Sequence, residues 1–437
     1  MSKLLKVLLI VVFTFTLGLV TLAQDVKPSG KIVVWMQQAN MDQIQKVVLP
    51  AFNEAYPDIE VEFVNYSPTE VANQLALAIQ GGAGAPDVAL TETAQIARIV
   101  DLGGVLDLTD YISADLPDLA PSSAELGKKD DRYYSMPWDI APVVMYYRRD
   151  IFEAAGLSSD PTEVNEMVST WDKYLEVCKT IKAETGLFCF ANNKANSYGD
   201  VWANMLWSQN IGWYSPEGQV TVDSPEAVAA LEKLGEFWAA DVLSDDLEWT
   251  DNWYAVLNQP VLDDAVVQPV ATVSIGAWMG GFLKNWAAPD TSGLWGVVEL
   301  PAMVEGGVRS SNQGGSSYVI PEQSQNVAAA WAFLSFVNSN ESQLALFDFG
   351  DIFPARQSTY TDPLFQKTDA YFADQAVREV YAVAGAAIPV APIYGMYYPV
   401  MNSATDTAIQ KFATGQLSAA DALAEAASII RSETGLQ

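Results

Sequence analysis

Two kinds of side chain in this sequence have the chemistry to bind a small polar molecule. The first is a set of polar side chains that follow the predicted strands 31–36 and 86–90, namely Gln37, Gln38, Asn40, Glu92, Thr93 and Gln95. The second is an aromatic ring, Trp278, which follows a β-rich run that turns at Gly276. A sugar has apolar faces and a polar rim, so a ring plane beside converging hydrogen-bonding groups matches its surface. Each polar residue can equally be a helix cap. For Trp278 we favour the binding role, and the alternative is a ring packed in the core between lobes.

The sequence contains no histidine. Catalysis by Ser-His-Asp or Cys-His groups, an imidazole general base and an ordinary zinc site are therefore excluded. We expect no metal, no cofactor and no enzymatic activity. One enzymatic alternative stays open, because a secreted glycoside hydrolase needs only two carboxylates and the chain has 54 acidic residues.

The two cysteines, Cys178 and Cys189, are eleven residues apart. In an oxidising compartment they can form a disulfide. The alternative is a pair of buried thiols, because Cys178 falls on the apolar stripe of a predicted helix and Cys189 lies in an apolar run. We favour the disulfide, and in either arrangement the role is structural.

Composition limits the kinds of partner. The chain has 437 residues, 50% of them hydrophobic, and a formal charge of −31. This length predicts two or three lobes with sizeable cores, and the strong negative charge argues against a nucleic-acid partner.

The N-terminus has the pattern of a secretory signal peptide over residues 1–23. Lys3 and Lys6 form a basic start, an apolar run extends to Val20, and small residues follow. The alternative is an uncleaved membrane anchor, because the apolar run approaches spanning length. We predict an exported protein, located in the periplasm or at the outer face of the cell membrane.

The order of predicted elements indicates an α/β fold. Strands at 31–36, 57–64 and 86–90 alternate with helical segments at 42–56 and 69–80, and Pro50 should kink or split the first of these segments. In parallel sheets, ligands bind beyond the carboxyl ends of the strands. The polar residues that follow these strands should therefore converge on one site. The C-terminal part is predicted to be mostly helical, at 326–339, 341–347, 372–384, 398–413 and 419–432.

Several of these segments, in this order, resemble the extracellular solute-binding proteins of ABC importers, the family-1 type that includes maltose-binding protein. The pieces are "KIVVWM", "PAFNEAYPDIEVEFV", "GAPDVAL" with "LGGVLDLTDYI", "YSMPWDIAPVVMYYRRDIFEAAGL", "STWDKYLEVCKTIK", "SIGAWMGGF", "AAAWAFLSFVNSNESQ" and "FPARQS". The resemblance implies two lobes, each a mostly parallel sheet with flanking helices, joined by a hinge of crossing segments. Crossings near 141–145, 270–275 and 316–321 would divide the chain into an N-terminal lobe of 25–142 plus 276–318 and a C-terminal lobe of 143–275 plus 319–437.

The resemblance also implies site residues. Trp278 matches the place of a stacking tryptophan in the family, and Trp138 and Asp139 should face the cleft just before the hinge, although a packed hinge tryptophan beside a capping Asp is equally open. Further ligand-binding residues are expected around the cleft, namely Tyr198, Asp200, Trp202, Gly314, Gly315, Tyr394, Tyr397 and Tyr398. The family often has a tryptophan where this chain has these last tyrosines. Four other tryptophans, Trp207, Trp213, Trp238 and Trp286, are read as core or surface residues.

The function that the resemblance implies is capture of a carbohydrate, either a mono- or an oligosaccharide, by closure of the lobes. The protein, expected to be a monomer, would deliver it to the transmembrane subunits of an ABC permease. A binding protein of the same fold for a peptide, polyamine or polyol phosphate is the alternative. Aromatic planes with amides in the cleft would favour a sugar, whereas clustered carboxylates would favour a cation.

Overall fold

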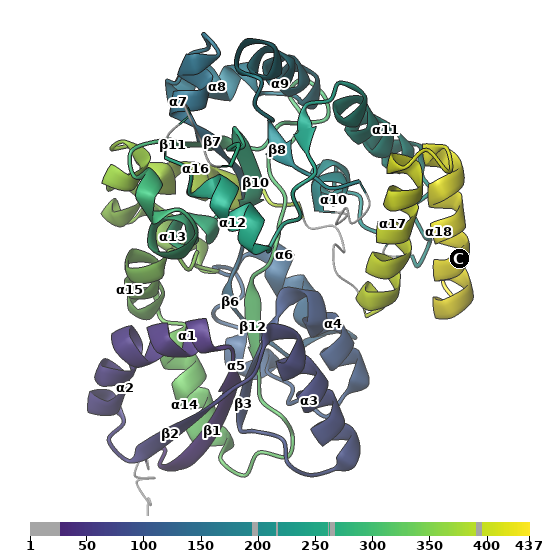
Figure 1. Cartoon of the computed structure of the whole chain (residues 1–437). Helices are drawn as coiled ribbons and strands as arrows, with labels where there is room; N and C mark the ends of the chain where they lie inside the picture. The colour runs from purple at the N-terminus through teal and green to yellow at the C-terminus, as the bar shows by residue number, and fades with distance from the viewer. Residues whose placement is uncertain (1–26, 195–199, 216, 261, 263–266, 390–395) are drawn as a thin grey trace, which may run out of the picture.

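The computed structural model describes residues 27–194, 200–215, 217–260, 262, 267–389 and 396–437, and it has two α/β lobes (Figure 1). The predicted signal peptide (1–23), Tyr198 and Tyr394 lie outside these residues. Within the described part of the chain, no helix has the length and apolar character needed to cross a membrane.

The N-terminal lobe is built on a five-stranded sheet with the order β2-β1-β3-β12-β6. The strands β1 (Gly30–Met36), β2 (Ile59–Asn65) and β3 (Val88–Glu92) are parallel, as the strand–helix alternation predicted. Strand β12 (Ser316–Val319) runs antiparallel between β3 and β6 (Met136–Asp139). A segment from the distant second half of the chain therefore joins the two parts of this sheet.

The helical segment after β1 is interrupted, as the position of Pro50 predicted. Helix α1 (Gln38–Gln43) continues into a π-helical turn, η1 (Ile44–Val48), and then into α2 (Leu49–Ala55). Pro50 lies in the first turn of α2, where its missing N–H costs nothing, and the turn before it absorbs the distortion.

Other helices cover both faces of this sheet. Helix α14 (Val327–Val337) packs its Phe333 against Phe52 of α2, with 5.5 Å between ring centroids. The remaining elements of this lobe are α3 (Pro68–Gly81), α4 (Thr93–Leu102), α5 (Thr109–Ile112), α6 (Pro121–Ala124), η2 (Glu125–Gly127), and the hairpin of β4 (Lys128–Lys129) and β5 (Arg132–Tyr133).

The main sheet of the C-terminal lobe differs from the expected parallel arrangement. Its central strand β7 (Val143–Arg148) pairs antiparallel with both β10 (Thr272–Gly276) and β11 (Trp295–Glu299). Parallel pairing in this lobe occurs between β8 (Phe190–Ala191) and β9 (Leu243–Ser244) and at the single bridges Phe188–Val270 and Thr170–Ala302. The α/β class and the two-lobed fold are confirmed, while the three-stranded sheet of this lobe is antiparallel.

Helices pack around this second sheet and contribute to the hydrophobic core of the C-terminal lobe. Thr170, Ser224 and Ser418 cap α9 (Trp171–Thr185), α11 (Pro225–Ala239) and α18 (Ala419–Thr434) with side-chain hydrogen bonds. The other helices are α7 (Arg149–Ala154), α8 (Pro161–Met167), α10 (Asp200–Trp207), α12 (Asp251–Leu257), α13 (Met279–Phe282), η3 (Leu283–Ala287), η4 (Pro289–Thr291), η5 (Gln357–Thr361), η6 (Pro363–Gln366), η7 (Ala370–Phe372), α16 (Val377–Ala386) and α17 (Tyr398–Ala413).

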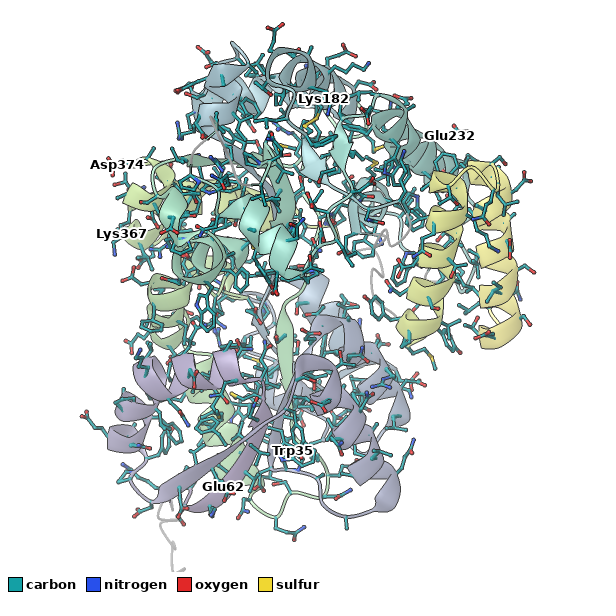
Figure 2. The ribbon with its side chains drawn as sticks, in the orientation of Figure 1. Trp35, Glu62, Lys182, Glu232, Lys367 and Asp374 are labelled. Atoms are coloured by element: carbon teal, nitrogen blue, oxygen red, sulfur yellow. A yellow bond between two sulfur atoms is a disulfide. The ribbon has the colours of Figure 1, made fainter. Side chains whose placement is uncertain are left out.

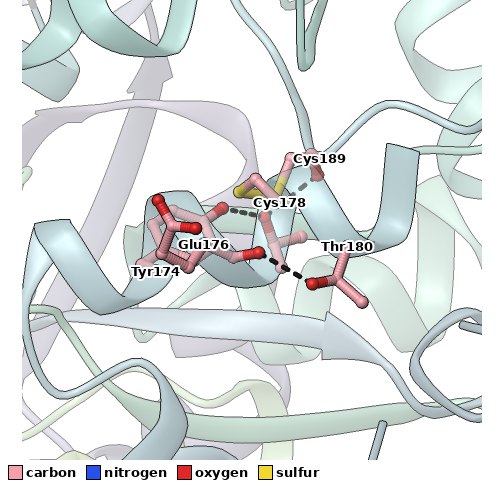
Figure 3. Close-up of a disulfide and its surroundings, with 6 residues drawn as sticks. Tyr174, Glu176, Cys178, Thr180 and Cys189 are labelled. Atoms are coloured by element: carbon pink, nitrogen blue, oxygen red, sulfur yellow. Dashed lines mark hydrogen bonds between the residues drawn. A yellow bond between two sulfur atoms is a disulfide. The ribbon is translucent and has the colours of Figure 1, made fainter. Parts of the chain in front are cut away.

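Cys178 and Cys189 form a disulfide, which confirms the favoured alternative (Figure 3). The bond ties α9 to the segment that leads into β8, and both cysteines are buried. Thr272 of β10 donates a hydrogen bond to the Cys189 carbonyl at 3.0 Å and is also hydrogen-bonded to the Tyr174 hydroxyl. The disulfide is therefore part of the C-terminal lobe's core.

The predicted division of the chain between the lobes is wrong for two segments. The segment 276–299 was expected in the N-terminal lobe, but it contains β11, which pairs with β7. Helix α14 was expected in the C-terminal lobe, but it shares a core with Ile32 and Phe52. The segment 270–275 is consequently no crossing. The chain instead passes between the lobes after β6, before β12, and after α15 (Asn340–Gly350), where Ile352 and Phe353 lie in the cores of different lobes.

Charged side chains lie mostly on the outer surface, where Figure 2 labels Glu62, Glu232, Lys367 and Asp374. An exception is the ion network at the end of α15. Asp351 is 4% exposed and accepts from Lys284 at 2.9 Å and from Arg378 at 3.1 Å. Because both cations belong to the C-terminal lobe, the network anchors the end of α15 to that lobe.

Candidate ligand-binding site

A cavity of about 930 Å³ lies between the two lobes. The N-terminal lobe contributes Glu92 at the end of β3, Asp139 at the end of β6 and Ser316 at the start of β12. These strand ends meet at one edge of the sheet, because β12 runs antiparallel to its neighbours. The C-terminal lobe contributes residues of α10, α13 and α17.

Trp278 lies in this cavity at the turn between β10 and α13. Its indole Nε1 donates to the backbone carbonyl of Gln313 at 3.0 Å, which holds the ring against the segment that leads into β12. The ring stacks on Trp249, with centroids 5.9 Å apart and planes inclined by 26°. Trp249 has a φ of +65° and is 43% exposed, so it presents an open ring face at the cavity.

A second aromatic group lines the cavity at α10 and α17. Tyr398 stacks on Trp213 with 5.2 Å between centroids and an angle of 23°, and Trp213 contacts Trp207 edge-on at 5.6 Å. Trp202, also a lining residue, is fully buried and donates from Nε1 to the Ala227 carbonyl at 2.9 Å. Trp202 therefore forms the rigid base of this wall.

A third aromatic group lies along α13 and η3. Phe282 contacts both Trp249 and Trp278 with centroid distances of 6.4 Å, and Trp286 follows four residues later. Phe349 of α15 also lines the cavity, with Lys46 Nζ 5.3 Å from its ring centroid. Trp286 is 74% exposed and Phe349 is 49% exposed.

Two carboxyl groups in the N-terminal lobe flank Ser316. Its register partners are Glu92 on β3 and Asp139 on β6. Burial raises the pKa of Asp139 to about 7, helped by the charge of Glu92 and opposed by hydrogen bonds from Ser316. Burial also raises the pKa of Glu92. At a given pH, both groups are therefore protonated to a greater extent than an exposed carboxyl. Hydrogen-bond donors on a bound ligand would stabilise their charged forms.

A third carboxyl group, Asp200, enters the cavity from α10. Gln313 Nε2 donates to Asp200 Oδ2 at 2.9 Å, so the same Gln313 contacts the Trp278 indole through its carbonyl and Asp200 through its amide. Burial and the charge of Asp406 raise the pKa of Asp200 to about 6. Gln313 therefore links the aromatic and acidic parts of the site.

Two glycines next to Gln313 permit its close contacts. Gly314 and Gly315 have φ values of +114° and +89°, a region that favours glycine. A Cβ on Gly315 would lie 2.8 Å from the Asp139 carbonyl and 3.0 Å from Thr93 Oγ1. Thr93 itself is buried, and its N–H donates to the Gly315 carbonyl at 2.9 Å.

The structure brings together most of the site residues predicted from the sequence. Those that line the cavity are Gln37, Asn40, Glu92, Asp139, Asp200, Trp202, Trp278, Gly314, Gly315 and Tyr398. Whether they bind a ligand stays a prediction.

Five other predicted residues do not line this cavity. Gln38 is exposed and donates to Asp42 at 2.7 Å, and Thr93 is buried behind Gly315. Trp138 is 1% exposed and packs on Tyr318 in the N-terminal core, which corrects the expectation that it faces the cleft. Tyr397 packs against the C-terminal core.

The fifth, Gln95, lines a separate cavity of about 640 Å³. This second cavity lies between α3 and α4 of one lobe and α17 of the other, and Arg98 and Asp406 also line it. Tyr398 and Asn402 line both cavities, so the two meet at the start of α17.

Several lining residues were missed from the sequence. Three of them, Trp207, Trp213 and Trp286, are predicted above as core or surface residues, and three more, Trp249, Phe282 and Phe349, have no predicted role. All six line the cavity, whereas Trp238 is a core residue as expected. One signal was available, because Trp278, Phe282 and Trp286 are spaced four residues apart and so share one helical face. No comparable periodicity marks Trp249.

The two sides of the cleft differ. On one side α15 lies between α13 and α1, and a Cβ on Gly281 of α13 would stand 2.9 Å from the Gly350 carbonyl (Figure 1). On the other side α17 faces α3 and α4 across the second cavity. The lobes are thus in close contact at α15 and separated at α17. Among the described residues, no group of His, Cys, Asp and Glu has the arrangement of a metal site.

Comparison with known proteins agrees with this architecture. The chain is 24% identical over 363 residues to an arabinooligosaccharide-binding protein of Halalkalibacterium halodurans, covering 80% of this chain and 77% of the relative. It is 26% identical over 391 residues to a lactose-binding protein of Rhizobium radiobacter, covering 87% of each. The solved structure of an ABC transporter associated binding protein from B. animalis subsp. lactis, in complex with β-1,6-galactobiose, superposes with a TM-score of 0.74 at 22% identity, covering 93% of this chain and 97% of that one.

A family assignment follows from the sequence profile. The profile described as bacterial extracellular solute-binding protein matches residues 37–344, which is well over half of the chain. The two lobes, the hinge segments and the lined cavity between them are what such a protein needs to enclose a solute. The chain belongs to the bacterial extracellular solute-binding protein family.

Proposed function

We propose that this protein captures a carbohydrate between its lobes and delivers it to the transmembrane subunits of an ABC importer. The observation that carries the proposal is the stacked pair of Trp249 and Trp278, which lines the same cavity as the carboxyl groups of Glu92 and Asp139 from the other lobe. Proteins of this family are exported and work outside the cytoplasm.

The chemistry of the cavity suits a neutral sugar. Indole faces pack against the C–H faces of a sugar ring, while carboxyl and amide groups bind its hydroxyls. The acceptors are Glu92, Asp139 and Asp200, and amide donors are available from lining residues such as Gln37, Asn40 and Asn402. Two relatives, an arabinooligosaccharide-binding protein and a lactose-binding protein, support the same class of ligand.

An anionic solute such as a polyol phosphate fits poorly. Among the described lining residues, Lys46 is the one cationic side chain, and it lies beside Phe349 at the rim. A phosphate is normally bound by an Arg fork, several donors or a helix N-terminus. Three buried carboxyl groups would instead repel it.

Closure of the lobes would complete the site. The ligand would contact residues of both lobes and so stabilise the closed arrangement over the open one. Contact at α15 and separation at α17 support a rotation about the α15 side that brings α17 toward α3 and α4. The permease would then recognise the outer surfaces of a closed monomer.

The test is a binding panel on the purified protein, read by intrinsic tryptophan fluorescence and isothermal titration calorimetry. The panel contains arabinose-, galactose- and glucose-based sugars of one to four units, with sn-glycerol 3-phosphate and spermidine as charged comparisons. We expect saturable binding of at least one neutral sugar and a change in tryptophan emission. Binding of spermidine alone, or a flat response to all sugars, would overturn the proposal. Size-exclusion chromatography with light scattering tests the monomer.

A further inference from the structure

The exposed aromatic residues of this protein are concentrated at one place. In the described part of the chain, four aromatic side chains are largely exposed, and three of them, Trp249, Trp286 and Phe349, line the interlobe cavity. The fourth, Tyr111, packs beside Trp331, 5.0 Å away, on the N-terminal lobe. Exposed rings are costly in water, so their concentration at a cavity indicates a binding surface.

Trp278, Phe282 and Trp286 form a continuous aromatic stripe. Helix α13 continues directly into η3, and the Phe282 N–H donates to the Trp278 carbonyl at 3.3 Å, which sets the helical repeat. The spacing of four residues therefore keeps the three rings on one face. Because η3 is a π-helical turn, the α-helical rise gives an upper value of about 12 Å along the axis from the first ring to the last, which is longer than one sugar ring.

The two ends of the stripe differ in burial. At the inner end, Trp278 is half-buried and its indole N–H is already used by Gln313. At the outer end, Trp286 is 74% exposed, and Phe349 of α15, which is 49% exposed, lines the same cavity with Lys46 beside its ring. Among the described residues, the outer end thus offers two exposed rings and polar neighbours.

The outer end is also preformed. Gly281 of α13 lies against Gly350 of α15, and a Cβ on Gly350 would overlap Gln43 of α1. Asp351 anchors the same end of α15 to Lys284 of η3 and Arg378 of α16. Trp286 and Phe349 are therefore carried on elements that already contact one another, on the side where the lobes meet.

From these observations we propose that Trp286 and Phe349 form an outer subsite for an additional sugar ring, so that the ligand is an oligosaccharide that extends from the Trp249–Trp278 pair along the stripe to the rim. This inference rests on the carbohydrate-binding function proposed above. A monosaccharide would occupy the inner pair and leave the outer rings in water. The protein thus discriminates between ligands by the number of their sugar units as well as by the type of sugar.

The test compares a series of one to four units, built on whichever sugar the wild type binds, with the Trp286→Ala, Phe349→Ala and Trp286→Phe variants. In the wild type, affinity should rise with chain length until the outer subsite is filled. Trp286→Ala and Phe349→Ala should bind the shortest ligand within about twofold of wild type but lose about tenfold on the longer ones. Trp286→Phe, which keeps a ring, should recover most of that loss. Val304→Ala, which truncates a side chain that is 65% exposed and lies outside the cavity, is the matched control.

The results separate this inference from its alternatives. An equal loss at every chain length, or no loss at any, would overturn the outer subsite while leaving carbohydrate binding intact. Unchanged affinities with reduced uptake by cells would also overturn it and assign Trp286 to contact with the permease. If the wild type bound no sugar of any length, the proposed function would fail first, and the inference with it.

Discussion

Gly276 lies directly beneath the indole of Trp278. A Cβ at Gly276 would overlap Trp278 Nε1 and would stand 2.9 Å from the Gln313 carbonyl that accepts the indole hydrogen bond. The absence of a side chain at this one position therefore allows the ring to fold back onto the segment that leads into β12.

Replacement of Gly276 by alanine should displace Trp278 and weaken ligand binding about tenfold or more. Overpacking at a close-packed position also destabilises, by about 1–3 kcal/mol. Calorimetric titration and urea denaturation measure the two effects. Gly81→Ala at the end of α3 is the control, because nothing lies within 4 Å of its Cβ position and binding should be unchanged. Full affinity in Gly276→Ala would show that the indole position does not matter.

Truncation of Trp249 should weaken binding with little effect on folding. Its ring is 43% exposed, so few core contacts are lost, but one of the two stacked indoles is removed. Aromatic contacts contribute about 0.5–1.5 kcal/mol beyond area burial, which predicts a loss of about three- to tenfold in affinity. Trp331→Ala, on the N-terminal lobe beside Tyr111, should bind as wild type does. Equal affinities for the two variants would contradict a role for Trp249.

Asp139 should make stability depend on pH in the direction opposite to a salt-bridged carboxyl. Its pKa rises from the usual 3.8 to about 7 on folding, mainly through burial, with Glu92 as the nearby charge. Between about pH 4 and 7 the folded chain keeps this proton while the unfolded chain has lost it, so this group's contribution falls as pH rises through the window. Asp139→Asn removes the effect.

The measurement is the difference in unfolding free energy between Asp139→Asn and wild type, from urea denaturation at pH 4.5, 6 and 7.5. Groups that do not interact with Asp139 cancel in this difference, including ion-paired carboxyls such as Asp348, whose pKa is lowered. The difference should move in favour of the variant as pH rises. A difference that stays constant with pH would mean that Asp139 ionises normally.

Removal of the charge of Asp351 should be destabilising. Asparagine tolerates the φ of +55° at this position, so Asp351→Asn isolates the loss of charge from backbone strain. Arg378 and Lys284 each lose one carboxylate partner but keep another, Asp348 and Asp369 respectively, so the expected cost is that of lost hydrogen bonds between charged groups, about 1.5–3 kcal/mol. Lys367→Ala breaks an exposed pair with Asp348 and should cost less than about 1 kcal/mol. The two urea midpoints are compared, and similar values would contradict the anchoring of α15.

The disulfide should contribute to stability and not to binding. Cys178 and Cys189 lie in the core of the C-terminal lobe, and neither lines the interlobe cavity. Reduction, or the Cys178→Ser/Cys189→Ser double variant, should lower the free energy of unfolding by about 2–4 kcal/mol. Ligand affinity measured well below the melting temperature should be unchanged. A large loss of affinity in the folded, reduced protein would show that the disulfide also affects the ligand-binding site.

Local signals in the sequence predicted local structure well. The interruption near Pro50 occurs as expected, and it is set by neighbours in the chain. The caps at Thr170, Ser224 and Ser418 are equally local, because Ser and Thr are typical N-cap residues. Which strand pairs with which depends on contacts between distant segments. The run "LWGVVELP" reads as β-like in either lobe, so its pairing with β7 could not be derived from it.

In the site too, features set by neighbouring residues could be predicted, whereas features set by contacts between distant segments could not. Trp138 and Asp139 were both expected to face the cleft, yet adjacent residues on a strand point to opposite faces. Since Asp139 lines the cavity, Trp138 must point into the core, and period-two alternation alone could have shown this. Trp249 is different, because it lies in a loop with positive φ and only the three-dimensional contact with Trp278 reveals it.

The place of β12 has a consequence for the order of folding. Its residues, 316–319, lie between β3 and β6, whose residues are all numbered below 140. The N-terminal lobe therefore cannot finish its sheet until most of the chain has been synthesised, and closing so long a loop makes this step slow. In a family whose members work outside the cytoplasm, this arrangement delays completion of the first lobe, because its sheet waits for a strand that emerges late from the ribosome.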